Sequence, residues 1–221
     1  MSYQHLFVNA SSANLPLGKV VCVGRNYAEH ARELNNPIPT EPLLFLKPAT
    51  AVVPLDQPLR LPQGKGDVHY ETEIALLIGQ TLSGEVTEAQ AHQAIAGVGL
   101  ALDLTLRELQ DQLKAKGHPW ERAKAFDGAC PLSHFVRPEQ LPNLHDIQLQ
   151  LHINGVLRQQ GNSSQMITPI IALLQQIACV FTLQPGDVVI TGTPAGVGVL
   201  ASGDSLELAI PGVLKQSATV S

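Results

Sequence analysis

The stretch from Val68 to Ile78 constrains the fold most, because its residues alternate between two faces with the two-residue period of a β-strand. One face carries every second residue from Val68, and the other carries His69, Glu71, Glu73, Ala75 and Leu77. Carboxylates at positions i and i+2 of a strand point to the same side, roughly 6 to 7 Å apart. Two like charges at that separation need either solvent or a cation, so this strand is also a candidate site.

Strand and turn signals dominate the rest of the chain. Strands are predicted at residues 19–23, 43–46, 98–102 and 149–157, the last as a hairpin with a type I′ turn at Asn154-Gly155, and through most of the C-terminal part. A first helix is predicted at residues 26–34, with Asn26 as its cap and Asn35-Asn36-Pro37 as its end. Capping boxes predict two more helices, one at residues 87–97 (Thr87 to Gln90) and one from Thr105 to Gly117 (Thr105 to Glu108). A last helix is predicted after Thr168, with Pro169 as its first residue. Because there is no regular βαβ rhythm, the predicted class is a strand-dominated α+β fold.

Composition narrows the class of protein. Of 221 residues, 44% are hydrophobic and only 15% are charged, so the chain can bury a sizeable core and is predicted to form one domain. Its net charge of −5, without a basic block, argues against binding nucleic acid or a membrane. The N-terminus lacks a signal-peptide pattern, and Cys22, Cys130 and Cys179 form no Cys-x-x-Cys pair, so a cytoplasmic protein is expected. The three cysteines are predicted to be core residues, because their contexts are apolar.

Asp103 adds a third carboxylate to Glu71 and Glu73. It follows the apolar strand predicted at residues 98–102, where burying an acid without a partner is costly. Three carboxylates without a cysteine or a paired histidine form an oxygen-rich donor set, which suits Mg²⁺ or Mn²⁺ better than zinc. The alternative is that the two glutamates lie on a solvent-exposed strand face and bind nothing.

Three further features are compatible with either chemistry or ordinary structure. His30 and Glu33, three residues apart on the first predicted helix, form either a water-activating dyad or a surface ion pair. Lys47 and Lys124 either hold a carboxylate or an enolate, or extend along the surface as solvated lysines. The glycine-rich run 192–198 lacks phosphate-loop spacing and is predicted to be a substrate-lining turn or simply a tight one.

Six segments, taken in order, resemble those of one known family. They are VVCVGRNYAEH from Val20, LFLKP from Leu44, HYETEI from His69, ALDLT from Ala101, PWERAKAFD from Pro119 and GDVVITGTP from Gly186. The chain from about Gly18 to its end resembles the small, single-domain members of the fumarylacetoacetate hydrolase family, of the acylpyruvase and oxaloacetate decarboxylase type. The resemblance implies a mixed β-sheet roll over residues 18–221, a lead segment over residues 1–17, and a homodimer.

The resemblance also implies roles for single residues. It places Mg²⁺ or Mn²⁺ on Glu71, Glu73 and Asp103. The catalytic residues that it implies are the lid-helix pair His30 and Glu33, together with Lys124. The substrate-binding residues that it implies are Arg25, Tyr27, Lys47, Arg107, Gln110 and Thr193.

The implied activity is the cleavage of a carbon–carbon bond in acylpyruvate-type substrates (2,4-dioxo acids), with a pyruvate enolate as the leaving group. In that scheme His30, oriented by Glu33, deprotonates water, Lys124 stabilises the enolate charge, and the first helix closes over the site. Oxaloacetate decarboxylation would proceed through the same enolate. Three alternatives remain: an isomerase or tautomerase of oxaloacetate or of a 2-oxo/2-hydroxydienoate, a non-catalytic metal-binding module, and an interaction scaffold with an empty site.

Overall fold

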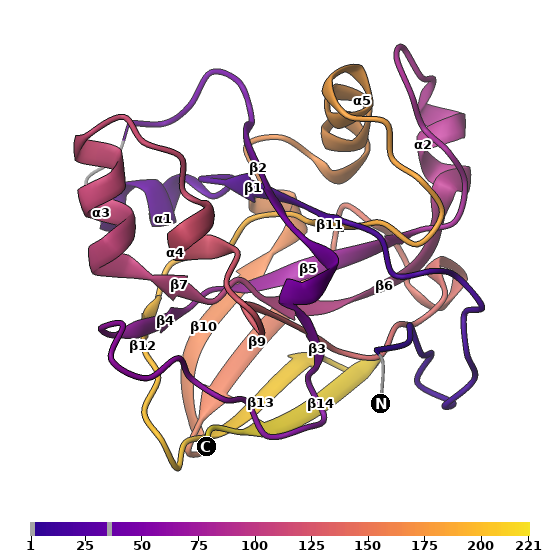
Figure 1. Cartoon of the computed structure of the whole chain (residues 1–221). Coiled ribbons are helices and arrows are strands. Elements are labelled where there is room, and N and C mark those ends of the chain that lie inside the picture. Colours follow the sequence, from indigo (N-terminus) through magenta and orange to yellow (C-terminus); the bar gives the residue numbers. More distant parts are fainter. Residues whose placement is uncertain (1–2, 35–36) are drawn as a thin grey trace.

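The computed structural model describes residues 3–34 and 37–221, and strands form most of its regular structure (Figure 1). A seven-stranded mixed sheet has the strand order β2-β1-β11-β5-β6-β8-β3. Its strands are β1 (Val20–Gly24), β2 (Leu43–Lys47), β3 (Val52–Pro54), β5 (Thr72–Ile78), β6 (Ile95–Leu102), β8 (Cys130–Leu132) and β11 (Val188–Ile190). β1 runs parallel to β11 and β3 parallel to β8, whereas the other neighbours are antiparallel. The predicted strand-dominated α+β class is confirmed.

Two smaller sheets have the orders β10-β9-β13-β14 and β12-β4-β7. Their strands are β4 (Val68–Tyr70), β7 (Thr105–Leu106), β9 (Gln148–Ile153), β10 (Val156–Asn162), β12 (Gly198–Val199), β13 (Ser205–Ile210) and β14 (Leu214–Thr219). The predicted hairpin joins β9 to β10 through Asn154 and Gly155. Both residues have positive φ, 53° and 78°, as a type I′ turn requires.

The stretch from Val68 to Ile78, predicted as one strand, is two strands in different sheets. β4 pairs with β7 and β12, whereas β5 pairs with β6 and β11. Glu71 lies at the break between them. Both faces of β5 are buried, so the alternative of a solvent-exposed glutamate face is wrong.

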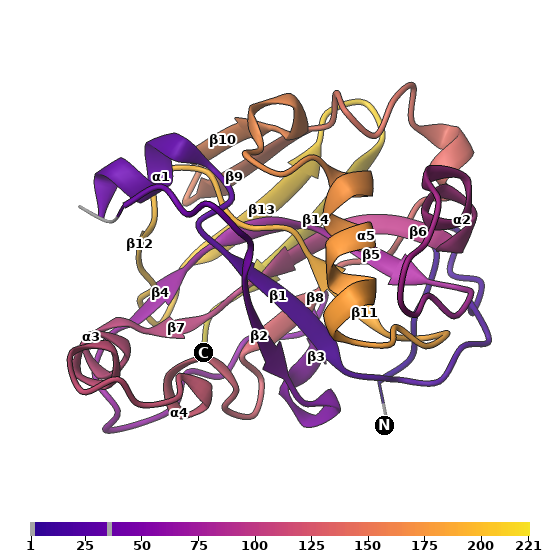
Figure 2. The same cartoon turned by 90° about the horizontal axis from the view of Figure 1, so that it is seen from above.

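Short helices lie outside the sheets in two groups (Figure 2). Helices α1 (Ala28–Glu33), α3 (Arg107–Ala115) and α4 (Glu121–Lys124) gather at one end, while α2 (Glu88–Ala94) and α5 (Ile170–Val180) pack against each other elsewhere. Single 3-10 turns occupy Ala49–Ala51, Pro138–Gln140 and Ser163–Gln165. Among the helices of residues 3–34 and 37–221, none combines the length and hydropathy needed to span a bilayer.

Asn26 and Thr105, predicted as helix caps, serve tertiary contacts instead. The N-cap of α1 is Tyr27, and the Asn26 side chain hydrogen-bonds the backbone of Thr168 and Thr191. Thr105 is buried in strand β7, so α3 begins two residues later and has no side-chain cap. Distant partners engage the side chain of Asn26 and the backbone of Thr105, which pairs with His69 of β4, so neither residue caps its helix.

The other helix predictions hold, with shifted ends. The capping box of Thr87 and Gln90 is confirmed, but α2 ends at Ala94, because residues 95–97 pair with β5 as the start of β6. Pro169 directly precedes α5 and is not its first residue. The predicted end of α1 at Asn35-Asn36 lies outside the described residues.

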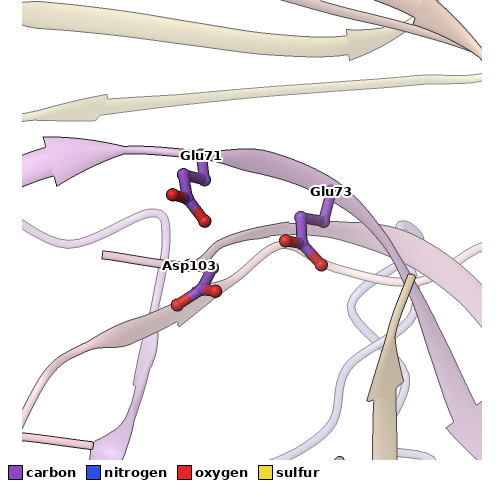
Figure 3. A group of neighbouring side chains, drawn as sticks. All are labelled: Glu71, Glu73 and Asp103. Carbon is purple, nitrogen blue, oxygen red and sulfur yellow. The ribbon is translucent and has the colours of Figure 1, made fainter. Parts of the chain in front are cut away.

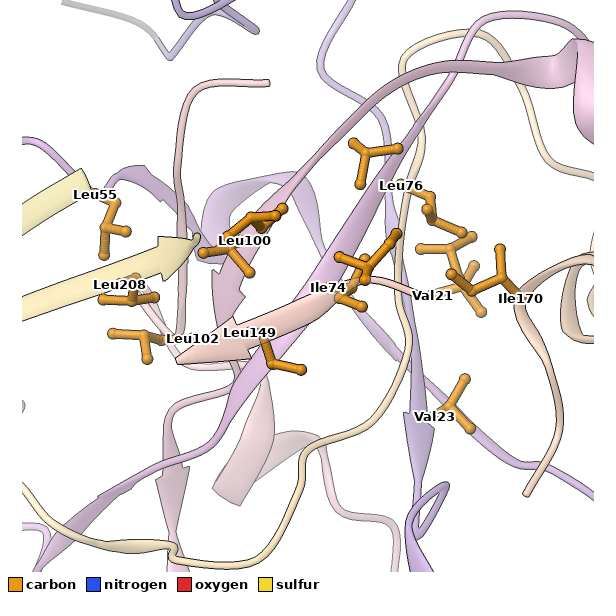
Figure 4. Packing of buried hydrophobic residues seen from close by; sticks show 14 of the residues in the cluster. Val21, Val23, Leu55, Ile74, Leu76, Leu100, Leu102, Leu149, Ile170 and Leu208 are labelled. Carbon is orange, nitrogen blue, oxygen red and sulfur yellow. The ribbon is translucent and has the colours of Figure 1, made fainter. Parts of the chain in front are cut away.

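The seven-stranded sheet is buried on both faces. On one face it packs against the four-stranded sheet and α5, as Figure 4 shows for Val21, Ile74, Leu76, Leu100, Leu102, Leu149, Ile170 and Leu208. The smaller cluster on the other face contains Cys22, Cys130 and, from the lead segment, Phe7. Residues 3–17 therefore contribute to this core, and the division between lead segment and domain stays a prediction. Cys179, predicted to be a core residue, is exposed on α5.

Candidate active site

Three carboxylates meet at the break between β4 and β5 (Figure 3). Glu71 lies in the break, Glu73 is in β5, and Asp103 follows the neighbouring strand β6. One oxygen from each residue lies within 4.8 Å of the other two. The residues are 5%, 1% and 1% exposed. The pairing of β5 with β6 thus brings together the acids that the sequence pattern singled out.

Buried cations balance two of these acids. Lys124 Nζ donates to Glu71 Oε2 at 2.8 Å and to Asp103 Oδ2 at 2.7 Å. Arg107 pairs with the other Glu71 oxygen, and Lys47 Nζ lies 2.8 Å from Asp103 Oδ1. Burial alone would raise the pKa of Glu71, but Lys124 and Arg107 hold that pKa well below its usual range. Burial alone would lower the pKa of Lys124, but the carboxylates of Asp103 and Glu71 raise it instead.

Glu73 differs from its neighbours, because none of the ion pairs among the described residues includes it. Its Oε2 accepts a hydrogen bond from the Gly192 N–H at 2.7 Å. Burial, together with the carboxylates of Asp103 and Glu71, raises the pKa of Glu73 well above its usual value. A divalent cation among the three acids would remove this repulsion, and carboxylate oxygens are ligands that Mg²⁺ and Mn²⁺ prefer. The residues present therefore fit such an ion.

Glu71 and Glu73 line a pocket to which most of the predicted site residues contribute. The other predicted residues on its wall are Arg25, His30, Arg107, Gln110, Lys124 and Thr193. An aromatic part of the wall comes from Phe45 and Trp120, whose ring centroids are 5.9 Å apart. The sequence pattern does not single out these two rings, because Phe45 in β2 and Trp120 before α4 are isolated aromatic residues, which ordinarily belong to the core.

Lys47 and Tyr27, predicted to contact substrate, do not line this pocket. Lys47 is fully buried, and its ammonium donates to the backbone carbonyl oxygens of Leu104, Lys124 and Ala129. It thereby supports Asp103 and the end of α4 from the interior. Tyr27 is 3% exposed, its hydroxyl has no hydrogen-bond partner among the described residues, and burial with nearby Glu73 raises its pKa.

Arg25 reaches the pocket wall from an unusual backbone conformation. Its φ is 62°, in the left-handed region that residues other than glycine seldom adopt. The next residue, Asn26, holds this turn: its amide donates to the carbonyl oxygens of Thr168 at 3.0 Å and Thr191 at 2.9 Å, and accepts from the Thr168 N–H at 2.8 Å. Such backbone strain persists where surrounding contacts fix it, and it is common at functional sites.

His30 and Glu33 form the predicted pair on α1. His30 Nδ1 lies 3.2 Å from Glu33 Oε2, and Glu33 Oε1 accepts a hydrogen bond from the Gly196 N–H at 3.0 Å. His30 is 4% exposed and lines the pocket, whereas Glu33 is exposed, so the pair connects the pocket wall to the protein surface. Because Glu33 engages Nδ1, Nε2 is the ring nitrogen left for proton exchange with a ligand.

Comparison with known proteins identifies the family of this chain. The family model described as Fumarylacetoacetate (FAA) hydrolase C-terminal matches residues 19–221. The chain belongs to the fumarylacetoacetate hydrolase family. A solved structure assigned to this family, from Yersinia pestis CO92, has a TM-score of 0.96 and 47% identity, and the match covers 99% of this chain and 100% of that chain. The family resemblance of the sequence and the predicted fold are thereby confirmed.

Several family members carry names for reactions of oxo acids. Oxaloacetate tautomerase YcgM of Escherichia coli K12 is 48% identical over 211 residues, which is 95% of this chain and 96% of that protein. Mitochondrial oxaloacetate tautomerase FAHD1 of Bos taurus is 44% identical over 88% of each chain. The structure of fumarylpyruvate hydrolase from Pseudomonas aeruginosa, in complex with Mn²⁺ and pyruvate, has a TM-score of 0.91 and 34% identity over 99% of this chain and 95% of that chain. Family membership alone therefore leaves the reaction open.

Proposed function

We propose that this protein is an enzyme that interconverts the keto and enol forms of oxaloacetate, with Mg²⁺ or Mn²⁺ as its cofactor. The observation that carries the proposal is His30, a buried imidazole on the pocket wall whose Nε2 has no hydrogen-bond partner among the described residues. The names of the relatives at 48% and 44% identity support oxaloacetate as the substrate. Acylpyruvate hydrolysis, the first expectation from the sequence, becomes the second candidate.

Glu71, Glu73 and Asp103 would hold the divalent ion. When bound, such an ion polarises the ketone of a 2-oxo acid and makes the adjacent methylene more acidic. Lys124 donates hydrogen bonds to two of these acids, and its raised pKa keeps it charged at neutral pH. Its ammonium is thus suited to stabilise negative charge that develops on the substrate oxygen.

Oxaloacetate carries two carboxylates, and the pocket wall offers basic side chains to match them. Arg25, Arg107 and Lys114 all line it. Arg107 is held in place by Glu71 and by a hydrogen bond to Gln110 Oε1 at 2.8 Å. A pocket lined by several cations attracts a small dianion more strongly than a neutral ketone. With a divalent ion balancing Glu71 and Glu73 on the same wall, these basic side chains would favour a dicarboxylate substrate.

Tautomerisation moves one proton between C3 and the oxygen on C2 of the substrate. His30 would accept the proton from C3 at Nε2 and return a proton to the oxygen, with the reverse order for ketonisation. Glu33 would orient the ring through Nδ1 and stabilise the imidazolium between the two transfers. Arg25 and Arg107 would hold the substrate carboxylates during the exchange, and no water needs to be activated.

The test is the rate at which freshly dissolved enol-oxaloacetate loses its ultraviolet absorbance in the presence of protein and Mg²⁺ or Mn²⁺. We expect His30→Asn to lower kcat/KM by about 10²-fold, as for loss of a general acid–base group. His145→Asn, at an exposed histidine, is the matched control and should stay within about twofold of the parent. A parent protein that does not accelerate the reaction over buffer would refute the tautomerase proposal.

Hydrolysis of an acylpyruvate is the second candidate. It is favoured by the His30–Glu33 contact, which suits activation of a water molecule, and by the similarity to fumarylpyruvate hydrolase. Pyruvate release separates the candidates, because hydrolysis and decarboxylation produce pyruvate whereas tautomerisation does not. A higher kcat/KM for acetylpyruvate or fumarylpyruvate than for enol-oxaloacetate would make hydrolysis the main activity. No turnover of any of these substrates would favour a non-catalytic module or scaffold.

A further inference from the structure

The loop of residues 192–196 links the carboxylate cluster to the His30–Glu33 pair. At its start, the Gly192 N–H donates to Glu73 Oε2 at 2.7 Å. At its end, the Gly196 N–H donates to Glu33 Oε1 at 3.0 Å. Thr193, between them, lines the pocket. The position of this loop therefore sets the positions of two side chains that the proposed reaction needs.

Among the described residues of β10, Gln159 is the one whose side chain hydrogen-bonds this loop. Most of β10 is exposed, but Gln159 is only 1% exposed, and the register of β10 on β9 shifts between Leu157 and Gln159. Such a shift marks a β-bulge, which re-aims a side chain. Gln159 Oε1 accepts from the Thr72 N–H at 2.9 Å, and Nε2 donates to Thr193 Oγ1 at 2.8 Å and to the Pro194 carbonyl oxygen at 2.9 Å. The amide uses both donors and its acceptor.

The Thr193 hydroxyl closes this set of bonds into a ring. It donates its one hydrogen to the Thr72 carbonyl oxygen at 2.9 Å, since its other acceptor, Pro194, is 3.4 Å away. Its oxygen accepts the hydrogen bond from Gln159. Thr72 follows Glu71 at the break between β4 and β5, so the ring ties β10, the break and the loop together.

Loop 192–196 is packed closely against β10. A Cβ atom on Gly161 of β10 would lie 2.7 Å from Pro194 Cβ, and one on Gly196 would collide with the Arg158 carbonyl oxygen. β10 and the loop are therefore in close contact at both glycines, and the Gln159 side chain hydrogen-bonds across this contact.

We propose that Gln159 is a positioning residue: without touching the ligand, it holds loop 192–196 so that Gly192 orients Glu73 and Gly196 orients Glu33. This inference rests on the proposed function of the same pocket. It predicts that loss of the Gln159 amide weakens divalent-metal binding through Glu73 and slows turnover through Glu33. If Gln159 only stabilised the fold, its loss would change neither metal affinity nor turnover in protein that is fully folded.

The test compares Gln159→Met with Gln160→Met. The two changes are chemically identical and adjacent, but Gln160 is exposed. Isothermal titration of metal-free protein with Mn²⁺ alone is expected to show about tenfold weaker binding for Gln159→Met and a change within about twofold for Gln160→Met. Circular dichroism at the assay temperature confirms folding. If Gln159→Met does not fold, Gln159→Glu replaces it, since that change keeps an acceptor for Thr72 and removes both donors.

A double-mutant cycle tests the path through Glu33. We expect Gln159→Met to lower kcat about tenfold in the parent but less than twofold in a Glu33→Gln background, because the residue it acts through is already altered. Equal losses in both backgrounds, together with parental Mn²⁺ affinity, would overturn the role of Gln159 and leave the proposed function intact. If the parent turns over none of the candidate substrates, the proposed function fails, and the Mn²⁺ titration alone decides the role of Gln159.

Discussion

Glu71 and Glu73 are two residues apart in one stretch of chain, yet their pKa values shift in opposite directions. Both are buried, which by itself raises a carboxyl pKa. Glu71 has Lys124 and Arg107 as partners, and its pKa falls, whereas Glu73 faces two carboxylates, and its pKa rises. The protein itself therefore leaves the charge of Glu73 unbalanced, and a divalent ion would balance it.

Glu73→Gln keeps the shape of the side chain and removes this charge. In the presence of a metal chelator, we expect the variant to unfold at a temperature about 2–4 °C higher than the parent, because the repulsion that the change removes is on the order of 1 kcal/mol. In saturating Mn²⁺ the order reverses, because the parent gains stability by binding the ion and the variant does not. Thermal melts of both proteins under both conditions measure this. Equal Mn²⁺-dependent shifts would show that Glu73 is not a ligand.

His5 makes stability depend on pH at a site far from the acids. Its Nε2 lies 3.1 Å from the Gly186 carbonyl oxygen, and burial lowers its pKa below the usual 6.5. As pH falls below about 6.5, the unfolded chain binds a proton that folded His5 resists, so stability decreases until the pH passes the lowered pKa. His5→Gln should lose less stability than the parent between about pH 7 and pH 5, by urea unfolding. Equal losses would contradict this assignment.

Residue spacing singled out Glu71 and Glu73, because the period of a strand places both carboxylates on one face. It left His30 and Lys124 open between chemistry and ordinary structure, and only the family resemblance implied their roles. Spacing could not predict that Lys47 is fully buried beside Asp103, since its partners are backbone carbonyls from distant segments. Spacing could not predict the burial of Gln159 either, because it is a polar residue on a mostly exposed strand and a β-bulge turns its side chain inward. Long-range hydrogen bonds of this kind leave no local pattern.

At the scale of elements, predictions held where the signal was local. The type I′ hairpin and the Thr87 capping box depend on a few neighbouring residues, and both are present. The predicted caps at Asn26 and Thr105 are wrong, because the Asn26 side chain hydrogen-bonds distant backbone groups and the Thr105 backbone belongs to strand β7. The break at Glu71 was missed for a related reason: the alternation continues across it, while the pairing partners change from one sheet to another.

Asn26 anchors the start of α1, and its loss should be costly. Asn26→Ala leaves one buried backbone group of Thr191 and two partly buried backbone groups of Thr168 short of a partner, which costs about 2–3 kcal/mol. For a chain of this size, the midpoint of thermal unfolding should fall by about 5–10 °C. Asn9→Ala, in an exposed turn, is the control, with an expected change below about 2 °C. Similar melting temperatures for the two variants would refute the anchoring role.

For the whole molecule, the family resemblance predicted more than hydrophobic periodicity did. Periodicity identified strands but could not give their order, because β1 and β11 are parallel neighbours from opposite ends of the chain. The mixed seven-stranded sheet, buried on both faces, follows from such distant pairings. The resemblance implied a mixed β-sheet roll with few helices, because it compares the whole chain with a complete fold, but it did not give the strand order.

The homodimer implied by the resemblance stays a prediction, as does a cytoplasmic location. Light scattering at micromolar concentration should give a mass twice the 23.6 kDa of the chain. The physical reason is that a chain with 44% hydrophobic residues has apolar surface left to bury after folding. A measured mass near that of one chain would refute the dimer.

The hydrogen bonds around the pocket join residues that are far apart in sequence. Thr72 and Gln159 are 87 positions apart, Glu73 and Gly192 are 119 apart, and Asn26 and Thr191 are 165 apart. Contacts that close such long loops form late, since each must first overcome a large loss of chain entropy. A chain released from denaturant should therefore gain secondary structure before it can bind Mn²⁺. The ability to bind the ion would mark the last step of folding, and a truncated or partly folded chain would lack it.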